Sequence, residues 1–501
     1  MTKESRTDIK LLAFDLGAES GRAMVGHFDG SHIQLEQVHR FANGPVRVGG
    51  SLYTDALYIW DQMQNGLQKA AAQYGKNLVS VGVDTWGVDF ALLDGRNNLL
   101  GNPHHYRDHR TDGMIELACS IVPQDEIYSQ TGNQFMQFNT LFQLYSLVRN
   151  DPNILLTAGS LLMLPDLFHF WLCGERANEY SVATTSQCYD QQKKDWAWDL
   201  IGQLGIPAGI FQPVIQPGQK IGSLHTWLAN AAGCPQLTVV VPASHDTGSA
   251  VTAVPVSGPD FMYISSGTWS LVGVELDQPC ITAQSLAYNL TNEGNPGGRT
   301  RFLKVVPGMW LLQQSRNEWA RAGRNYSYEE LTNLAASAPT CGSMVDITAP
   351  EFIDPGDMPA RIRSFCQETR QPIPQTDGEV ARCILESLAY QYRSLLEDFE
   401  LVLGKRLTVV HIIGGGSKND LLNQITSNCV NRPVIAGPVE ATAIGNLLMQ
   451  ALGLGYLSTV KEIRQVIRSS FQPVIFEPHH SLQWEEGYQR YRQLSRLLRR
   501  R

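Results

Sequence analysis

At mid-chain the sequence reads Pro242-Ala243-Ser244-His245-Asp246-Thr247-Gly248-Ser249-Ala250, directly after the apolar run Leu237-Thr238-Val239-Val240-Val241. The apolar run predicts a buried strand, and a strand that ends in small polar residues carries their side chains to the rim of a sheet, where open α/β folds bind ligands. Asp246 then offers a carboxylate with little bulk around it, which suits a general base that takes a proton from an alcohol. The alternative is that Asp246 only caps the N-terminus of a helix, a position that aspartate also favours.

Two other segments share one pattern, in which an apolar strand runs through a polar, glycine-containing turn into a second apolar strand. The turns lie at 15–22 and 265–270, and a third glycine turn at 414–420 follows the predicted strand 407–413. Such turns expose backbone N–H groups that can hold phosphate oxygens, although each turn alone can be a simple connection. Together they favour a duplicated α/β chain with a nucleotide held between its two halves.

The first of these turns carries two charged residues with alternative roles. Arg22 can offset the charge of a phosphate, or it can form a surface ion pair. Asp15 ends a predicted buried strand, where it can hold Mg²⁺ through water or serve as a turn aspartate. The sequence alone leaves these alternatives open.

Strands and helices alternate through the rest of the chain, which predicts α/β architecture. We expect a strand at 78–83 with 90–93 as its hairpin partner, and a strand followed by a core helix within 154–174, where Asp166 argues against a membrane span. The expected helices are at 61–74, 139–149, 378–403 and 440–452, with another in the Arg-rich tail from Arg490. The boundary between the two halves is expected between Ser249 and Pro259.

Composition narrows the class of protein. The 501 residues are 43% hydrophobic and 18% charged, which is ordinary for a globular protein, and the net charge of −8 argues against binding to nucleic acid. The nine cysteines form no C-x-x-C pair, and residues 1–10 hold no signal-peptide core, so we expect a reduced, cytoplasmic protein. P-loop, dinucleotide-binding and G-x-S-x-G motifs are absent, and the pairs His104-His105 and His479-His480 lack the spacing of metal ligands.

The motifs together resemble the rhamnulokinase branch of the FGGY carbohydrate-kinase family, in order from about residue 11 to 450. The stretches that carry this resemblance are Phe14-Asp15-Leu16-Gly17-Ala18-Glu19-Ser20-Gly21-Arg22, Asp84-Thr85-Trp86-Gly87-Val88-Asp89-Phe90, Tyr106-Arg107-Asp108, Phe138-Asn139-Thr140-Leu141, Ser244-His245-Asp246-Thr247, Ser265-Ser266-Gly267-Thr268-Trp269-Ser270, Thr291-Asn292-Glu293-Gly294, and 414–416 through 435–441. The resemblance implies two ribonuclease-H-like domains of the actin and hexokinase type with a cleft between them. Their expected ranges are 8–253 for the sugar-binding domain and 254–475 for the ATP-binding domain, followed by a helical tail at 476–501.

The same resemblance implies ATP-dependent phosphorylation of L-rhamnulose at O1, with Mg²⁺ as the metal and no nucleic acid, membrane or specified oligomer as partner. Asp246 is the implied base, and it binds the sugar together with Gly87, His245 and Thr247. The implied ATP contacts are Ala18, Glu19, Ser20, Gly21, Arg22, Gly267, Thr268, Gln313 and Gly415, and Asp15 is the implied metal-side aspartate. The alternatives are a kinase for another ketose, such as L-fuculose or a pentulose, and an actin-like nucleotide-binding protein that transfers no phosphate.

The chain also departs from the family pattern. The Phe-Gly-Gly-Tyr string is absent, Glu19 places a carboxylate in an expected phosphate turn, and Val305 stands where the family leads us to expect asparagine. Cys366 and Cys383 keep the spacing of a disulfide pair in the family, but a reducing cytoplasm makes us expect free thiols.

Overall fold

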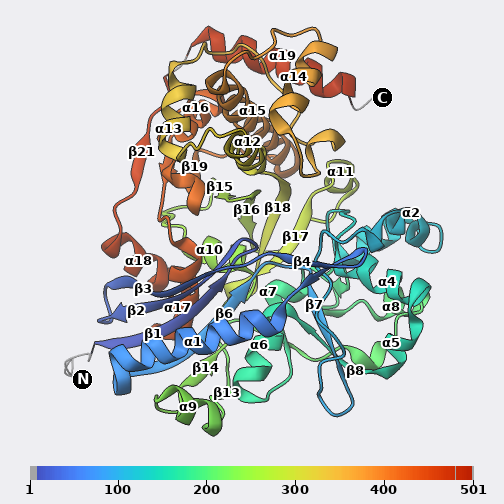
Figure 1. The fold of residues 1–501 in the computed structure, drawn as a ribbon, viewed down its shortest axis with the longest axis vertical. Coiled ribbons are helices and arrows are strands. Elements are labelled where there is room, and N and C mark those ends of the chain that lie inside the picture. Colours follow the sequence, from blue (N-terminus) through green and yellow to red (C-terminus); the bar gives the residue numbers. More distant parts are fainter. Residues whose placement is uncertain (1–7, 480, 499–501) are drawn as a thin grey trace. The chain divides into compact units, whose positions relative to one another are not determined.

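The computed structural model describes residues 8–479 and 481–498, which divide into two compact units (Figure 1). The first unit contains the chain up to Pro255 together with Glu275–Phe302 and Ala441–Phe471. The second unit contains Val256–Val274, Leu303–Glu440 and the chain from Gln472 onward. Each unit is therefore assembled from segments that are far apart in the sequence.

The first unit is built on a six-stranded sheet in the order β13-β14-β6-β1-β2-β3. The strands are β1 (Ile9–Leu16), β2 (Ser20–Phe28), β3 (Ile33–Ala42), β6 (Leu78–Thr85), β13 (Lys220–Ser223) and β14 (Thr238–Val240). β1 pairs antiparallel with β2 and parallel with β6, and β6 pairs parallel with β14. All eight residues of β1 are buried, because this apolar strand lies inside the sheet and both of its faces are covered.

Helices α1 (Ala56–Tyr74) and α17 (Ala441–Gly453) cover the two faces of this sheet. Gly66 of α1 lies against the ring of Phe14 on β1. On the other side, the Asn446 side chain of α17 donates a 2.6 Å hydrogen bond to Asp84, which is in register with Asp15 on β1. Because neighbouring residues of a strand point to opposite faces, Phe14 and Asp15 place α1 and α17 on opposite sides of the sheet.

Strand β7 (Phe90–Asp94) corrects one of our predictions. It pairs antiparallel with β8 (Ala158–Met163) in a separate two-stranded sheet, not with 78–83 as predicted. The physical reason is that β6 already has β1 and β14 on its two edges, so no edge is left for β7. β8 leads into the core helix α6 (Leu164–Cys173), as predicted, and none of the helices in residues 8–479 and 481–498 has the length and apolar character needed to cross a bilayer.

The second unit repeats the strand arrangement of the first. Its strands are β15 (Phe261–Ser266), most of β16 (Trp269–Leu276), the second half of β18 (Arg299–Pro307), β19 (Val409–Ile413), β20 (Val434–Ala436) and β21 (Val474–Phe476). The sheet order is β17-β18-β16-β15-β19-β20-β21, in which β17 (Thr291–Asn295) comes from the chain segment of the first unit. β15 pairs antiparallel with β16 and parallel with β19, which pairs parallel with β20. A hairpin followed by parallel strands is thus common to both sheets, which confirms the duplication that the two hairpins predict.

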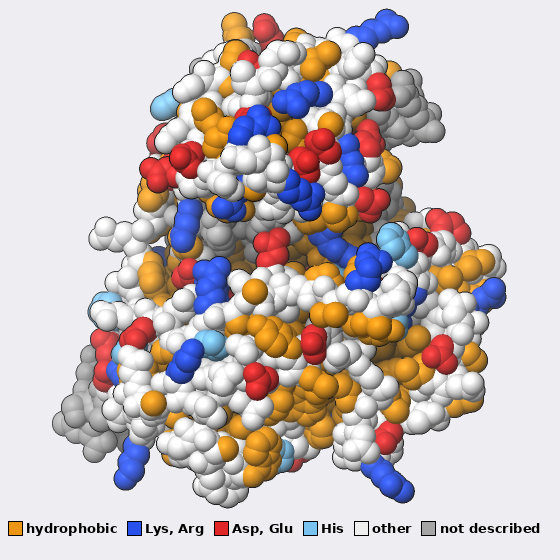
Figure 2. Space-filling view, viewed as in Figure 1, with side chains coloured by type: hydrophobic (Ala, Val, Ile, Leu, Met, Phe, Trp, Pro, Cys, Tyr) orange, Lys and Arg blue, Asp and Glu red, His pale blue; other side chains and the backbone are white. Residues whose placement is uncertain are grey.

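Helices of the second unit pack around α15 (Asp377–Leu403), the longest helical pattern in the sequence. Its neighbours include α12 (Trp310–Arg321), α16 (Asp420–Val430) and α19 (Leu482–Leu498). The Tyr491 hydroxyl of α19 donates a 2.7 Å hydrogen bond to Gln391, which ties the predicted tail helix to α15. Figure 2 shows basic and acidic side chains interspersed on the face in view, without a continuous basic area among the described residues.

All nine cysteines are free thiols. Cys366 on α14 (Met358–Glu368) and Cys383 on α15 are in hydrogen-bond contact through their side chains.

Candidate active site

The segment that holds Asp246 lies beside the end of β6. The Thr85 N–H donates a 2.9 Å hydrogen bond to the carbonyl of Ser244, and helix α10 (Asp246–Thr252) begins two residues later. Asp246 is the first residue of the helix and His245 occupies the cap position, so the simple N-cap interpretation of Asp246 is wrong. The side chain of Asp246 is 30% exposed whereas that of His245 is 7% exposed, so Asp246 presents the accessible carboxylate of the pair.

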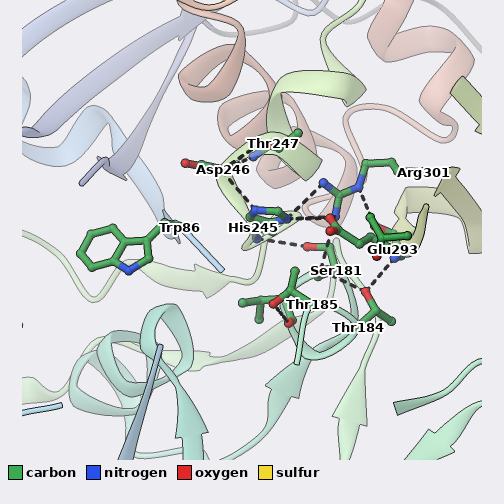
Figure 3. Close-up of polar contacts among 12 residues, drawn as sticks. Trp86, Ser181, Thr184, Thr185, His245, Asp246, Thr247, Glu293 and Arg301 are labelled. Atoms are coloured by element: carbon green, nitrogen blue, oxygen red, sulfur yellow. Dashed lines mark hydrogen bonds and ion pairs between the residues drawn. The ribbon is translucent and has the colours of Figure 1, made fainter. Parts of the chain in front are cut away.

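A buried carboxylate fixes the backbone just before Asp246. Glu179, the cap of helix α7 (Tyr180–Ala183), accepts a 3.0 Å hydrogen bond from the Ser244 N–H and a 2.6 Å bond from the Ser181 hydroxyl. The Ser181 oxygen in turn accepts the N–H of His245 at 3.1 Å (Figure 3). Burial raises the pKa of Glu179 to about 7, although hydrogen bonds from Ser181 and Ser244 oppose the rise. These contacts hold the peptide groups that carry His245 and Asp246.

A strained turn presents Gly87 near the same edge of the sheet. The Asp89 N–H donates to the Gly87 carbonyl at 2.9 Å, and Val88 between them has a φ of +66°, which is rare for a β-branched residue. The Val88 carbonyl accepts the Thr140 hydroxyl at 2.7 Å, and the Val88 N–H donates to Thr185 at 3.1 Å. A Cβ on Gly87 would lie 2.8 Å from the Thr185 hydroxyl, so this position requires glycine. The 138–141 motif thus has a structural role, since Thr140 stabilises the turn.

Three charged residues lie side by side on neighbouring strands: Arg22 on β2, Asp15 on β1 and Asp84 on β6. Arg22 is 2.5 Å from Asp15, which is the ion pair that the sequence offers as one alternative. Burial raises the pKa of Asp84 well above its ordinary value, and the charges of Asp15 and Asp246 raise it further, against the hydrogen bond from Asn446. The second oxygen of Asp84 has no hydrogen bond within the described part of the chain.

This excess of negative charge fits a divalent cation, and carboxylate oxygens are ligands that Mg²⁺ prefers. No group of three or more His, Cys, Asp or Glu side chains in the described residues is arranged to hold a metal by itself. Mg²⁺ usually keeps several waters and takes the rest of its ligands from one or two carboxylates and substrate phosphates. The residues around Asp15 are compatible with that mode.

The turn that joins β1 to β2 covers residues 17–19, so Ser20, Gly21 and Arg22 begin β2. Asn43 holds it from the next strand, because its side-chain amide donates to the Gly17 carbonyl at 2.9 Å and its N–H donates to the Glu19 carbonyl at 3.0 Å. Glu19 is exposed, while Ala18 and Ser20 are half-buried. A Cβ on Gly21 would lie 2.2 Å from the ring of Phe41, so packing alone already requires glycine there.

The other predicted nucleotide residues come together in the second unit. Gly267 and Thr268 lie in the β15–β16 turn, and their carbonyls accept the N–H groups of Met309 and Gly308, both at 2.9 Å, where α12 begins. Gln313 lies one turn into α12, and its side-chain oxygen is buried without a hydrogen bond among the described residues.

Gly415 follows β19 at the same edge of that sheet, since β15 and β19 run parallel and end together. A Cβ on the next residue, Gly416, would lie 2.0 Å from the Ser266 hydroxyl, so the two turns approach closely. Val305, the departure from the family pattern, is partly buried on β18.

Comparison with protein families shows which family the chain belongs to. The FGGY family of carbohydrate kinases matches residues 10–253 through its N-terminal domain and residues 262–454 through its C-terminal domain. The chain belongs to the FGGY family of carbohydrate kinases. As a carbohydrate kinase it uses ATP as co-substrate and a small-molecule sugar as acceptor.

Relatives of this kinase match most of its length. It is 41% identical over 476 residues to a rhamnulokinase of Bacteroides thetaiotaomicron, covering 95% of this chain and 97% of that protein. It is 42% identical over 460 residues to a rhamnulokinase of Halalkalibacterium halodurans, covering 92% and 97%. Its fold is similar to a ligand-bound xylulose kinase from Lactobacillus acidophilus (TM-score 0.77, 16% identity, 98% and 96% covered) and to Plasmodium falciparum glycerol kinase with ADP (TM-score 0.75, 13% identity, 98% of each). The two-domain fold expected from the resemblance is confirmed.

Several residues around the kinase site were not singled out from the sequence. Glu179 and Ser181 have no motif of their own, and the only signal for Glu179 is a carboxylate before a short helix. Arg301 is fully buried on β18, but Arg299 and Lys304 lie on the same strand, so no sequence signal distinguishes Arg301 from them. Asp89 lies in the 84–90 motif, which by itself implies no role for it.

The raised pKa of Asp89 leads us to predict that the stability of this kinase depends on pH. Burial raises its pKa to about 7, although the Trp86 indole N–H donates to it at 2.9 Å and the Thr54 hydroxyl at 3.2 Å. Between about pH 4 and pH 7 the folded protein therefore keeps a proton that the unfolded chain has lost, so the free energy of unfolding falls as the pH rises through that window. Asp89→Asn keeps an oxygen for both donors and removes the proton, so the variant should lose a smaller part of its stability over the window.

The measurement is urea unfolding of the wild type and Asp89→Asn at pH 5, 6 and 7.5. Asp125→Asn, at an exposed position in the first turn of α3 (Gln124–Thr131), is the control for loss of a carboxylate. If the free energy of unfolding changed with pH equally in the wild type and Asp89→Asn, the raised pKa of Asp89 would be wrong.

Proposed function

We propose that this kinase phosphorylates L-rhamnulose at O1 with ATP, giving L-rhamnulose 1-phosphate and ADP in L-rhamnose catabolism. The observation that carries the proposal is the full-length similarity to proteins named rhamnulokinases, at 41% and 42% identity. The stretches 84–90 and 244–247, which we associate with that branch of the family, occupy one edge of the first sheet, where Thr85 is hydrogen-bonded to Ser244. The proposed sugar contacts and the proposed base therefore lie on neighbouring segments of the chain.

In this proposal Asp246 is the general base. Its accessible carboxylate accepts the O1 proton while O1 forms a bond to the γ-phosphorus of ATP, and the bond from that phosphorus to the β–γ bridging oxygen breaks to release ADP. Gly87, His245 and Thr247 hold the ketose, since all three lie beside Asp246 or on the turn that follows β6. The transfer itself depends mainly on positioning and on stabilisation of charge.

ATP is assigned to residues of both units. Ala18, Glu19, Ser20, Gly21 and Arg22 supply the turn of the first unit, and Gly267, Thr268, Gln313 and Gly415 supply the turns of the second. Gly267 is exposed and has no side chain, so a phosphate can approach this turn closely. The side-chain oxygen of Gln313, which has no hydrogen bond among the described residues, can accept one from the nucleotide. The exposed Glu19 carboxylate points to contact with a metal or with solvent and not with a bare phosphate.

Asp15, with Asp84 beside it, would hold Mg²⁺, which neutralises charge on the β- and γ-phosphates when it is bound. Arg22 keeps the Asp15 carboxylate in place through their ion pair. A cytoplasmic location, where thiols stay reduced, is part of this proposal.

A coupled assay of ADP release tests the proposal. L-Rhamnulose, L-fuculose and L-xylulose are offered separately with ATP and Mg²⁺, and kcat/KM is compared, with a reaction lacking sugar as the control. We expect L-rhamnulose to give the highest kcat/KM and the sugar-free reaction to give little ADP. A higher kcat/KM with another ketose would show that L-rhamnulose is not the preferred substrate. ADP release that no sugar stimulates would overturn the kinase role of the site.

A further inference from the structure

Arg301 is a large, fully buried cationic side chain beside the site. Its side chain is fully buried on β18, within the part of the chain that belongs to the first unit. Both terminal nitrogens lie 3.1 Å from Nδ1 of His245, and Nε donates to the Gly294 carbonyl at 3.0 Å (Figure 3). One terminal nitrogen also contacts the Ser181 carbonyl at 3.4 Å. His245 is the only residue assigned to substrate binding that this guanidinium touches through its side chain.

Glu293 balances the charge of Arg301. Its carboxylate is 3.2 Å from the guanidinium and is 6% exposed. Burial would raise the pKa of Glu293, but the charge of Arg301 opposes the rise, and the pKa lies below its ordinary value. A buried ion pair of this kind is costly to desolvate and rarely improves stability over apolar residues. A role in orienting the His245 imidazole accounts for the presence of this ion pair.

The contacts determine which nitrogen of His245 carries the proton. A guanidinium only donates hydrogen bonds and does not lose its proton in proteins, so Nδ1 must accept from it. Glu293 also lies 3.2 Å from Nδ1, but the oxygen concerned makes no hydrogen bond in the described residues, so it takes no proton from the ring there. The ring proton is therefore on Nε2, which lies 3.4 Å from the Asp246 carboxylate.

We infer that Arg301, balanced by Glu293, is a positioning residue that holds His245 as a neutral imidazole with its Nε2–H directed to the Asp246 side of the site. This inference rests on the proposed function, in which that side receives the ketose. A ring in this state donates one hydrogen bond to a hydroxyl or carbonyl oxygen of the sugar and has no lone pair left to act as a second base. The charged side chains around the ring are those of Arg301, Glu293 and Asp246, and the motif at 291–294 thereby acquires a role.

The test is nitrogen NMR of the whole protein labelled with ¹⁵N-histidine at pH 7.5. The His245 signals are assigned as those that vanish in His245→Gln. We expect the wild type to show a protonated Nε2 and an unprotonated Nδ1. In Arg301→Met, Glu293 becomes the only charged neighbour of Nδ1, and the proton should move to Nδ1 or be shared by both nitrogens. The KM for the ketose should rise about fivefold to tenfold, as loss of one hydrogen bond predicts, while the KM for ATP stays within twofold.

Arg464→Met is the matched control. Arg464 is a buried arginine of the first unit that pairs with Glu275 at 2.8 Å, so its loss removes a comparable ion pair without touching His245. It should leave both the His245 signals and the KM for the ketose unchanged. A change in the His245 signals equal to that of Arg301→Met would show that the effect is general loss of structure and would overturn the inference.

The wild-type spectrum decides the inference even if Arg301→Met does not fold. A wild-type His245 protonated on Nδ1, or on both nitrogens, would refute it, as would an unchanged His245 spectrum in a folded Arg301→Met. Failure of the proposed function is recognised separately, because it appears as a wild type that turns over no L-rhamnulose. In that case the tautomer remains a property of the folded site and the assignment of the sugar is withdrawn.

Discussion

Asp246→Asn should lower kcat for the sugar by about 10²–10⁴-fold while the protein stays folded. The amide has the shape of the carboxylate and can still accept the Thr247 N–H, which Asp246 accepts at 2.5 Å. It cannot take the proton of the attacking hydroxyl, so only the chemical step is impaired. The measurements are kcat from the coupled assay, affinities for sugar and ATP from calorimetry, and the unfolding midpoint from circular dichroism.

Asp357→Asn provides the control for an aspartate at the start of a helix. Asp357 is an exposed N-cap in the second unit that accepts the Ala360 N–H at 3.0 Å. Its replacement should leave kcat unchanged and lower stability only slightly. If Asp246→Asn kept turnover within threefold of the wild type, Asp246 would not be the base.

Gly445→Ala should be among the most damaging single changes to stability. Gly445 of α17 lies against α10, and a Cβ there would be 1.9 Å from the Ser249 carbonyl oxygen and 2.6 Å from its carbon. Since the obstacle is backbone within a buried helix, no side-chain movement relieves it. We expect the free energy of unfolding to fall by about 3 kcal/mol. Because Asp246 is the first residue of α10, displacement of that helix should also lower kcat, by about tenfold or more.

Gly202→Ala is the matched glycine control. Gly202 lies in helix α8 (Trp198–Gln203), is exposed, and a Cβ there would meet nothing within 4 Å. This substitution should leave stability unchanged or raise it by about 0.5–1 kcal/mol. The experiment is urea unfolding followed by the activity assay, and an unfolding curve of Gly445→Ala that matched the wild type would contradict the packing argument.

Local patterns account for the parts of the fold that sequence predicted well. Each glycine turn between two apolar runs became a hairpin, as in β1–β2 and β15–β16, because the pattern and the structure lie in the same few residues. The helix at 377–403 was also evident from the spacing of its apolar residues. By contrast, the partner of β7 is β8, many residues further on, and nothing in the local sequence favours this pairing over a hairpin.

In the site, too, contacts between sequence neighbours could be predicted, whereas contacts between distant segments could not. His245, Asp246 and Thr247 are adjacent in sequence, so their proximity needed no structure, although their roles in catalysis and binding stay predictions. The groups that orient them come from elsewhere in the chain: Glu179 holds the backbone and Arg301 holds the imidazole. Neither belongs to a motif by spacing, because only the folded chain brings them to residues 244–247.

The late position of α17 in the chain affects how the kinase is made. A ribosome releases residues 8–255 well before residues 441–471, yet α17 supplies the Asn446 amide that pairs with Asp84 and the Gln450 amide that bonds the Leu12 carbonyl at 2.9 Å. Until then one side of the first sheet is uncovered and its buried polar groups have no partner from this helix. The N-terminal unit therefore completes its folding only after residues 441–471 have been synthesised, and a product truncated before residue 441 would contain an unfinished unit that chaperones and proteases recognise.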